Sequence, residues 1–211
     1  MIDLHCHSHF SDGALSPELL FQKASAAGLR VLALTDHDTT DGLLPLQCAA
    51  KNSDITIING IELSARWKKH DIHILGLQIR PSDPNLKALI IRQNESRIAR
   101  AKEIGERLKG CGVTDAYVKA CNIAGHERVA RPHYAQVLID AGLVPDMKAA
   151  FKRYLGRGRG AYVPTAWLSI EEAVEGIVAA GGQAVIAHPL KYDVTNTELH
   201  ALIDECKEAR A

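Results

Sequence analysis

Imidazole and carboxylate side chains recur at a small set of positions along this chain of 211 residues. His5 and His7 are two residues apart, so on an extended segment both rings point the same way. Nitrogen and oxygen ligands without a thiolate suit Zn, Mn or Fe better than Ca or Cu(I). The pattern therefore predicts a metal centre. Its expected ligands are His5, His7, Asp12, His37, Glu62, His73 and His188.

This set is large enough for two or three divalent ions, because one ion takes about three or four protein ligands. A carboxylate such as Glu62 can bridge neighbouring ions. Bound ions make a hydroxide nucleophile available near neutral pH and polarise a phosphoryl oxygen. Phosphate esters, amides and lactams are all eligible substrates on that ground. A single histidine near a strand end is more often a hydrogen-bonded structural residue, and only the joint pattern favours metal binding.

Short apolar strands are expected to position these side chains. Segment 31–34 is apolar on both faces, as in a parallel strand that helices cover. Strands that alternate with helices predict an α/β sheet or barrel, where ligands bind at the carboxyl ends of the parallel strands. The expected strands cover residues 2–5, 31–34, 55–63 and 71–77, and the helices between the first three cover 16–27 and 41–51.

Three further side chains of this region have an expected placement. Glu62 is expected near the end of its strand. Cys6 lies between two predicted ligands, but a strand turns it to the opposite face. Asp36 is placed to orient a ligating histidine from behind, as metal sites usually require.

The alternation breaks after the fourth expected strand. Residues 84–110 follow a helical pattern, and the glycine-rich stretch 156–160 follows as a loop. The residues between them are predicted to form helices without a strand, so we expect a helical insertion. The expected segments are residues 1–80 (first part of the barrel), 81–165 (insertion) and 166–211 (barrel continued).

Basic side chains concentrate in the insertion of a chain that carries 25 basic and 25 acidic residues. No Asp or Glu occurs between Asp146 and Glu171. Guanidinium groups bind phosphate with two hydrogen bonds, so this segment favours an anionic substrate. The alternative is a solvated basic helix face. The basic residues are Lys148, Lys152, Arg153, Arg157 and Arg159, with Arg128, Arg131 and His133 upstream.

Composition indicates a cytoplasmic protein. No apolar run approaches the roughly 20 residues that span a bilayer, and the first residues lack the pattern of a signal peptide. The five cysteines form no C-x-x-C pair, so neither a disulfide framework nor a thiolate zinc site is indicated. Nothing in the sequence predicts a protein partner.

The motifs resemble those of the PHP family, named for polymerase and histidinol phosphatase. The matching pieces are Asp3-Leu4-His5-Cys6-His7-Ser8, Ser11-Asp12-Gly13, Thr35-Asp36-His37-Asp38, Gly60-Ile61-Glu62, His73-Ile74-Leu75-Gly76 and Ile186-Ala187-His188-Pro189. The resemblance implies a distorted (β/α)7 TIM-like barrel. It also implies three ion positions, held by His5, His7 and Glu62, by Asp12 and His37, and by Glu62, His73 and His188.

One family motif is absent. PHP proteins carry an Asp-x-His motif near the C-terminus, and this sequence contains none after His188. We therefore expect a barrel that is incomplete at its C-terminal end. An inactive fragment that binds metal or nucleotide without turnover is one alternative to an active enzyme.

The insertion resembles that of the subgroup containing nucleoside 3′,5′-bisphosphate phosphatase and a 5′→3′ exoribonuclease. The resemblance implies that residues 81–165 cap the substrate. Segment Arg131-Pro132-His133-Tyr134-Ala135 resembles the part that grips phosphate. The resemblance implies hydrolysis of nucleotide bisphosphates or trimming of RNA 5′ ends by metal-activated hydroxide. Arg131 and His133 would hold the phosphate, and His133 or a water would protonate the leaving oxygen. A phosphatase for a small metabolite such as histidinol phosphate is the other enzymatic alternative.

Overall fold

The computed structural model describes residues 1–210, which divide into two compact units. The first unit comprises Met1–Gln93 together with the chain from Ala166 onward, and the second comprises Asn94–Thr165. The expected segment boundaries at residues 80 and 165 stay a prediction.

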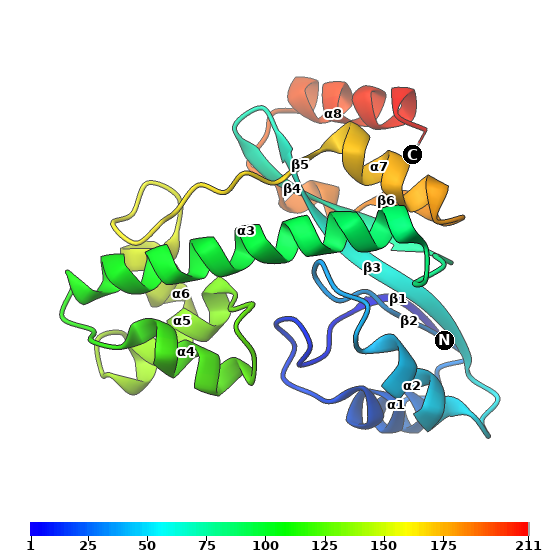
Figure 1. Ribbon diagram of the computed structural model, residues 1–211, viewed down its shortest axis with the longest axis horizontal. Helices are drawn as coiled ribbons and strands as arrows, with labels where there is room; N and C mark the ends of the chain where they lie inside the picture. Colours follow the sequence, from blue (N-terminus) through cyan, green and yellow to red (C-terminus); the bar gives the residue numbers. More distant parts are fainter. Residues whose placement is uncertain (211) are drawn as a thin grey trace. The chain divides into compact units, whose positions relative to one another are not determined.

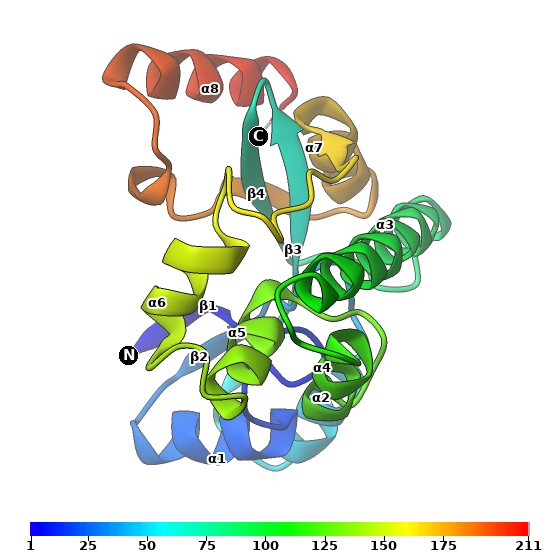
Figure 2. The same ribbon diagram turned by 90° about the vertical axis from the view of Figure 1, so that its left-hand side faces the viewer.

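The first unit is built on a curled, mixed β-sheet (Figures 1 and 2). The strand order is β1-β2-β3-β4-β6, and β5 pairs with β3. Pairing is parallel among β1, β2 and β3 and antiparallel from β3 to β4 and from β4 to β6. The expected α/β class is confirmed, although the sheet is mixed. The strands are β1 (Ile2–Cys6), β2 (Val31–Leu34), β3 (Thr56–Trp67), β4 (His70–Leu77), β5 (Leu168–Ser169) and β6 (Gln183–Ile186).

Helices of the first unit begin at side chains that cap them. The Ser16 hydroxyl accepts the Leu19 N–H at 3.3 Å, directly before Pro17, so the predicted helix start is confirmed. Ser169 and Thr195 open their helices with a reciprocal glutamate three residues later. The helices are α1 (Pro17–Ala26), α2 (Leu43–Ala50), α7 (Ile170–Ala179), the 3₁₀ helix η2 (Pro189–Lys191) and α8 (Asn196–Glu208).

The main core of the first unit lies between the sheet and helices α7 and α8. Helix α7 packs on β3, β4 and β6. Ile61, Leu63 and Ile74 of the sheet are fully buried there, with Ile177 and Leu202 of the helices. A smaller cluster packs α1 and α2 on β2. The helices of both groups therefore cover one and the same face of the sheet.

The second unit is helical, and no strand lies between Leu77 and Leu168. The division between the two units falls within α3. Fully buried Ala101, Ile104 and Tyr134 belong to the core of this unit. The stretch is helical, as expected, and its role as an insertion that caps the substrate stays a prediction. Its helices are α3 (Pro84–Lys109), α4 (Ala116–Ala124), α5 (Arg131–Asp140), α6 (Met147–Ala150) and the π-helix η1 (Phe151–Leu155).

The third strand corrects the sequence prediction. It does not end near Glu62 but continues to Trp67 and turns back as an antiparallel hairpin with β4. The turn lacks the Asn-Gly or Asp-Gly signal typical of two-residue hairpin loops. Lys68 instead adopts φ 50° there. Glu62 therefore lies in mid-strand, and His73 reaches the same place from an antiparallel neighbour.

Within residues 1–210, no helix is long and apolar enough to cross a membrane.

Trp67 ties the hairpin to α8. Its ring is 1% exposed, and its Nε1 donates to Glu205 Oε2 at 2.7 Å. We expect Trp67→Ala to lower the free energy of unfolding by about 3–5 kcal/mol, because it leaves a cavity. Urea unfolding measures the change. Trp67→Phe keeps most of the buried ring and should cost clearly less, so equal losses for the two variants would contradict a packing role.

Candidate metal centre

The carboxylate of Glu62 lies at the centre of a ring of histidines. Glu62 is fully buried. Five imidazole nitrogens lie 3.0–3.3 Å from its two oxygens. The structure therefore brings the histidines of the predicted ligand set to one point. They are His5, His7, His37, His73 and His188.

Each ring arrives from a different place in the sheet. His5 lies in β1 and His7 just after it, His37 follows β2, His73 lies in β4, and His188 follows β6. Two backbone hydrogen bonds join Glu62 to the residues on either side of His37. The Glu62 N–H donates to Asp36 O at 3.1 Å, and the Asp38 N–H donates to Glu62 O at 3.0 Å. Strand pairing, rather than loop flexibility, sets the geometry of the cluster.

The donor atoms fit divalent cations. A carboxylate offers about four acceptor positions, fewer than the five imidazoles around Glu62. Some ring lone pairs therefore face the same space without a donor. The Nε2 atoms of His5 and His7 lie 3.2 Å apart. Two ligands at about 2.05 Å from one ion, at a tetrahedral angle, are separated by roughly that distance.

Two overlapping groups of ligand atoms have the spacing of an ion site. One comprises His5, Glu62 and His188, and the other comprises His7, His37 and Glu62. Within each group the ligand atoms lie within 4.8 Å of one another. Glu62 belongs to both groups, so it is placed to bridge two ions.

The electrostatics of the cluster centre on Glu62. Burial raises the pKa of its carboxyl group, but hydrogen bonds from the surrounding imidazoles, that of His188 first, outweigh burial and hold the pKa far below its usual range. Burial lowers the pKa of His7, yet the hydrogen bond and charge of Glu62 and the charge of Asp12 raise it by more. The site holds fixed negative charge where a cation would bind.

Asp12 lies at the rim of the cluster. Its carboxylate oxygens are 3.8 Å from His7 Nδ1 and 3.8 Å from His37 Nε2. Its side chain is 23% exposed, whereas that of Glu62 is 1% exposed. The structure thus places the seventh predicted ligand beside the second group of ligand atoms, on the solvent side.

The profile of the PHP domain matches residues 3–175. The chain belongs to the PHP family. The resemblance drawn from the motifs is confirmed.

Individual relatives narrow the placement within the PHP family. The chain is 46% identical over 205 residues to a 5′-3′ exoribonuclease of Haemophilus influenzae, covering 97% of this chain and 74% of that protein. It is 43% identical over 203 residues to a 3′,5′-nucleoside bisphosphate phosphatase of Chromobacterium violaceum, covering 96% and 71%. A solved structure of an amidohydrolase from Chromobacterium violaceum, with bound sulfate and no metal, matches with a TM-score of 0.95 at 42% identity. That match covers 99% of this chain and 74% of the other.

Asp36 of the PHP cluster acts on the loop after β1 rather than directly on a histidine. It is 1% exposed and accepts from Ser8 N–H at 2.7 Å, Ser8 Oγ at 2.6 Å and Ser11 Oγ at 2.6 Å. Ser11 Oγ in turn lies 3.5 Å from His7 Nδ1. An orienting role of Asp36 toward His7 would therefore act through Ser11, and this role stays a prediction.

A second buried hydrogen-bond network was not predicted from the sequence. Asp38 accepts from Ser64 N–H at 2.8 Å, from Ser64 Oγ at 2.9 Å and from Gln93 Nε2 at 3.0 Å. Gln93 Nε2 also donates to Ser64 O at 2.6 Å. The network links the loop after His37 to the strand of Glu62 and to α3. Gln93 carries no local signal, because only the fold brings it to Asp38.

Tyr192 is another neighbour that the sequence did not single out. Its hydroxyl accepts the His73 N–H at 2.9 Å, and its ring lies 5.4 Å from that of His188. Burial raises the pKa of Tyr192. Tyr192 therefore supports two of the histidines from one side. In the sequence, only the position of Tyr192 four residues after His188 could have indicated this contact.

Cys6 points away from the PHP cluster. Its Sγ donates to Ala33 O at 3.2 Å, and burial, followed by the charges of Asp3 and Asp36, raises its pKa to about 12. A protonated thiol that faces the neighbouring strand is a poor metal ligand.

Arg131 and His133 lie at the start of α5, in the second unit. His133 is 9% exposed, and its Nδ1 accepts the Ala130 N–H at 3.0 Å. The neutral ring therefore carries its proton on Nε2. The guanidinium of Arg131 lies 5.8 Å from the centre of the Phe151 ring. Both side chains are held in place by neighbours of their own unit.

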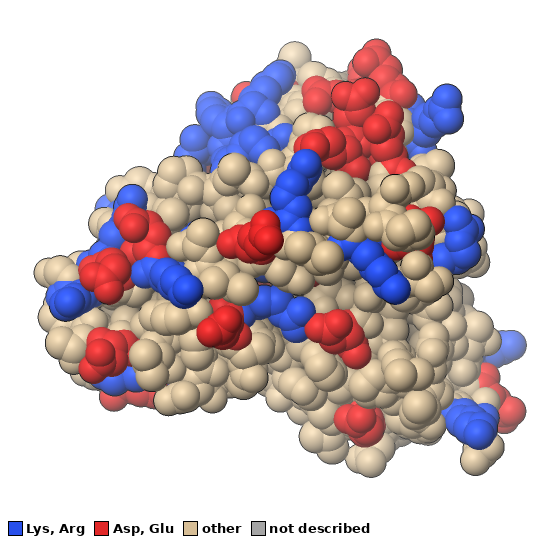
Figure 3. Space-filling view, in the orientation of Figure 1, with Lys and Arg blue, Asp and Glu red and all other residues tan. Residues whose placement is uncertain are grey.

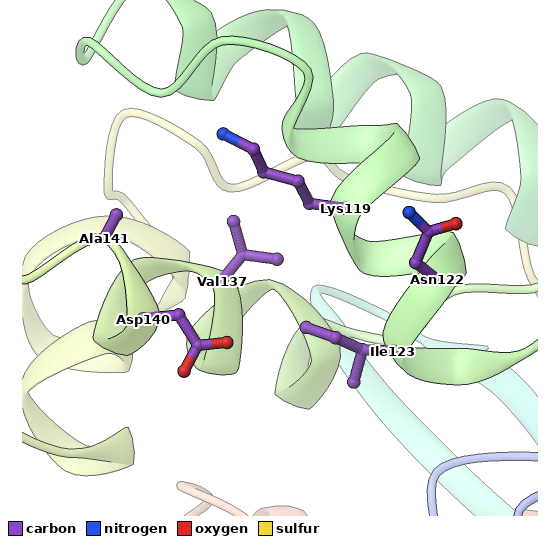
Figure 4. Close-up of a pocket in the computed structure, with 6 residues that line it drawn as sticks. All are labelled: Lys119, Asn122, Ile123, Val137, Asp140 and Ala141. Carbon is purple, nitrogen blue, oxygen red and sulfur yellow. The ribbon is translucent and has the colours of Figure 1, made fainter.

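A pocket of about 330 Å³ lies in the second unit between α4 and α5 (Figure 4). It contains none of the predicted site residues. Its lining residues are Lys119, Asn122, Ile123, Val137, Asp140 and Ala141.

We expect Asp36→Asn to weaken metal binding by about 10-fold to 100-fold, the usual effect of removing a group that orients ligands. Titration with Mn²⁺ measures the affinity. Asp54→Asn makes the same change of charge at an exposed position of the same unit and serves as the control. Equal affinities for the two variants would contradict the positioning role of Asp36.

Proposed function

We propose that this PHP protein is a metal-dependent phosphoesterase that removes phosphate from nucleoside 3′,5′-bisphosphates and trims RNA from its 5′ end. The buried Glu62 carboxylate among five imidazoles carries the proposal. The two curated relatives with those activities support the choice of substrate. The assignment predicts a hydrolase that needs divalent ions.

The seven predicted ligands are assigned to two or three ions of Mn, Zn or Fe. Glu62 would be shared between the two groups of ligand atoms, and Asp12 and His73 adjoin those groups. Bound divalent ions supply an activated water near neutral pH and neutralise charge on a phosphoryl oxygen. Glu62 contributes the negative charge that holds cations in a buried place, and the rings contribute neutral nitrogen donors.

Arg131 and His133 are assigned to the phosphate group. The planar guanidinium of Arg131 can bind two phosphate oxygens at once, and its contact with Phe151 limits its freedom. The Nδ1 of His133 is engaged by the Ala130 N–H, so the neutral ring carries its proton on Nε2. This tautomer is the one that can donate a proton to a leaving oxygen.

Phosphate release from adenosine 3′,5′-bisphosphate and mononucleotide release from a short 5′-phosphorylated RNA test the function. Both are measured with added Mn²⁺ and compared with histidinol phosphate. Turnover of the nucleotide substrates supports the proposal. A clear preference for histidinol phosphate would contradict it and favour a small-metabolite phosphatase. Fewer than two ions per chain would favour an inactive fragment.

Glu62→Gln should abolish turnover and lower the number of bound ions. The amide keeps the shape of the side chain but removes the charge that two groups of ligands share. Elemental analysis of the purified variant measures the ions, and circular dichroism verifies the fold. Removal of metal by a chelator should have the same effect on the wild type and be reversed by Mn²⁺. A variant with full metal content would contradict the bridging role.

Arg131→Ala should lower kcat/KM for the bisphosphate by about 10²–10³, the usual loss when one donor to a reacting oxyanion is removed. Arg131→Lys keeps the charge but not the paired hydrogen bonds, so only part of the activity should return. Unchanged kinetic constants in Arg131→Ala would rule out phosphate binding by this residue.

His133→Asn should lower kcat by about 10²–10⁴. Its side-chain oxygen can still accept the Ala130 N–H, but it lacks the donor at the position of Nε2. The pH profile of kcat distinguishes proton donation from a structural role: loss of its alkaline limb supports donation, and an unaltered profile contradicts it.

A further inference from the structure

Five exposed basic side chains form a strip in the second unit. We call Lys148, Lys152, Arg153, Arg157 and Arg159 the basic strip. Among residues 1–210, none of the five forms an ion pair with a carboxylate, and no Asp or Glu occurs between Asp146 and Glu171. The arrangement of charge along α3 is different from that of the basic strip: basic and acidic side chains are interspersed there (Figure 3).

The backbone under the basic strip is ordered by its own hydrogen bonds. Gly156 N–H donates to Phe151 O at 2.8 Å and closes the π-helix η1. Ala161 N–H then donates to Tyr154 O at 3.0 Å. Leu155 and Ala161 are fully buried and anchor the two ends of the loop. The basic side chains therefore project from a fixed turn rather than from a free chain.

The strip is continuous with the proposed phosphate-binding residue. Arg131 lies against the ring of Phe151, the first residue of η1. Lys152 is the next residue, and the loop with Arg157 and Arg159 follows directly. Basic residues thus follow one another along η1 and into the loop, beginning next to the residue that Arg131 contacts.

This amount of charge exceeds what a mononucleotide needs. A bisphosphate has only two phosphate groups, and the proposed function already assigns Arg131, His133 and the metal centre to the one that reacts. The strip offers up to five further cations with no acidic partner. Tyr154 packs against the core of the unit, so η1 presents charge rather than an aromatic platform to a ligand. Contacts of this kind read the backbone and not the bases.

We infer that the basic strip binds the sugar-phosphate backbone of an RNA substrate beyond its 5′-terminal nucleotide. This inference rests on the proposed function, because Arg131 would hold the 5′-terminal phosphate. The strip makes the enzyme favour long RNA over mononucleotides without a preference for sequence.

The test variant is Lys152→Gln, Arg157→Gln and Arg159→Gln combined. These side chains are exposed, whereas Arg153 is left intact because it donates to Leu143 O. Kd is measured by fluorescence anisotropy for a labelled 5′-phosphorylated RNA of about twelve nucleotides, in chelator, over a range of salt. KM is measured for the same RNA and for adenosine 3′,5′-bisphosphate with Mn²⁺.

Each phosphate contact to a single strand contributes about 0.7 to the slope of log Kd against log salt concentration. Loss of three contacts should therefore reduce this slope by about 2. At 0.1 M salt this corresponds to RNA binding that is up to about 100-fold weaker. KM for the bisphosphate should stay within about twofold, since the variant changes no residue assigned to the reacting phosphate. Variants of the RNA sequence should bind alike.

The matched control combines Lys23→Gln, Lys51→Gln and Lys87→Gln, which removes the same charge from exposed positions of the first unit. Equal loss of RNA binding in the control and in the strip variant would overturn the inference, as would an unchanged salt slope in the strip variant. If the wild type hydrolyses neither substrate, the proposed function fails, while the anisotropy measurement still decides whether the strip binds RNA.

Discussion

The contact of one buried carboxylate with several imidazoles is the constraint on which the first unit is organised. Glu62 has no access to water, and a charge in such a place is stable only when it is compensated. Five rings surround its two oxygens, more than the roughly four hydrogen bonds that a carboxylate can accept, so not every ring can pair with it. The fold therefore holds ligands in an arrangement that a cation completes. Metal binding and stability of the site are thereby coupled.

The rest of the unit restrains this arrangement from behind. Asp36 and Asp38 flank His37 in sequence and are both buried, yet they act on opposite sides. Asp36 holds the loop with Ser8 and Ser11, whereas Asp38 holds the strand of Glu62 through Ser64. Each carboxylate accepts at least three hydrogen bonds. Buried hydrogen-bond networks of this kind favour a single conformation, which is what a centre with several ligands requires.

Much of this could be predicted from the sequence because the ligands lie where local patterns are strong. His5 and His7 show the period of a strand, and Ser16 marks a helix start. The hairpin of β3 and β4 was not predictable in the same way: no turn residue announces it, and Lys68 adopts an uncommon backbone conformation instead. Gln93 illustrates the other limit. Its role depends on a contact with Asp38, 55 residues away in the chain, and no local pattern encodes that contact.

The π-helix η1 has a consequence for how this part of the protein can change over evolutionary time. Its five-residue turn follows directly on the α-helical residues of α6. Each residue of an α-helix advances the chain by about 100° around its axis. Deletion of a single residue within Phe151–Leu155 would restore α-helical spacing and swing the following loop, with Arg157 and Arg159, to another side of the unit. Selection can therefore act on the number of residues in this segment as well as on their identity.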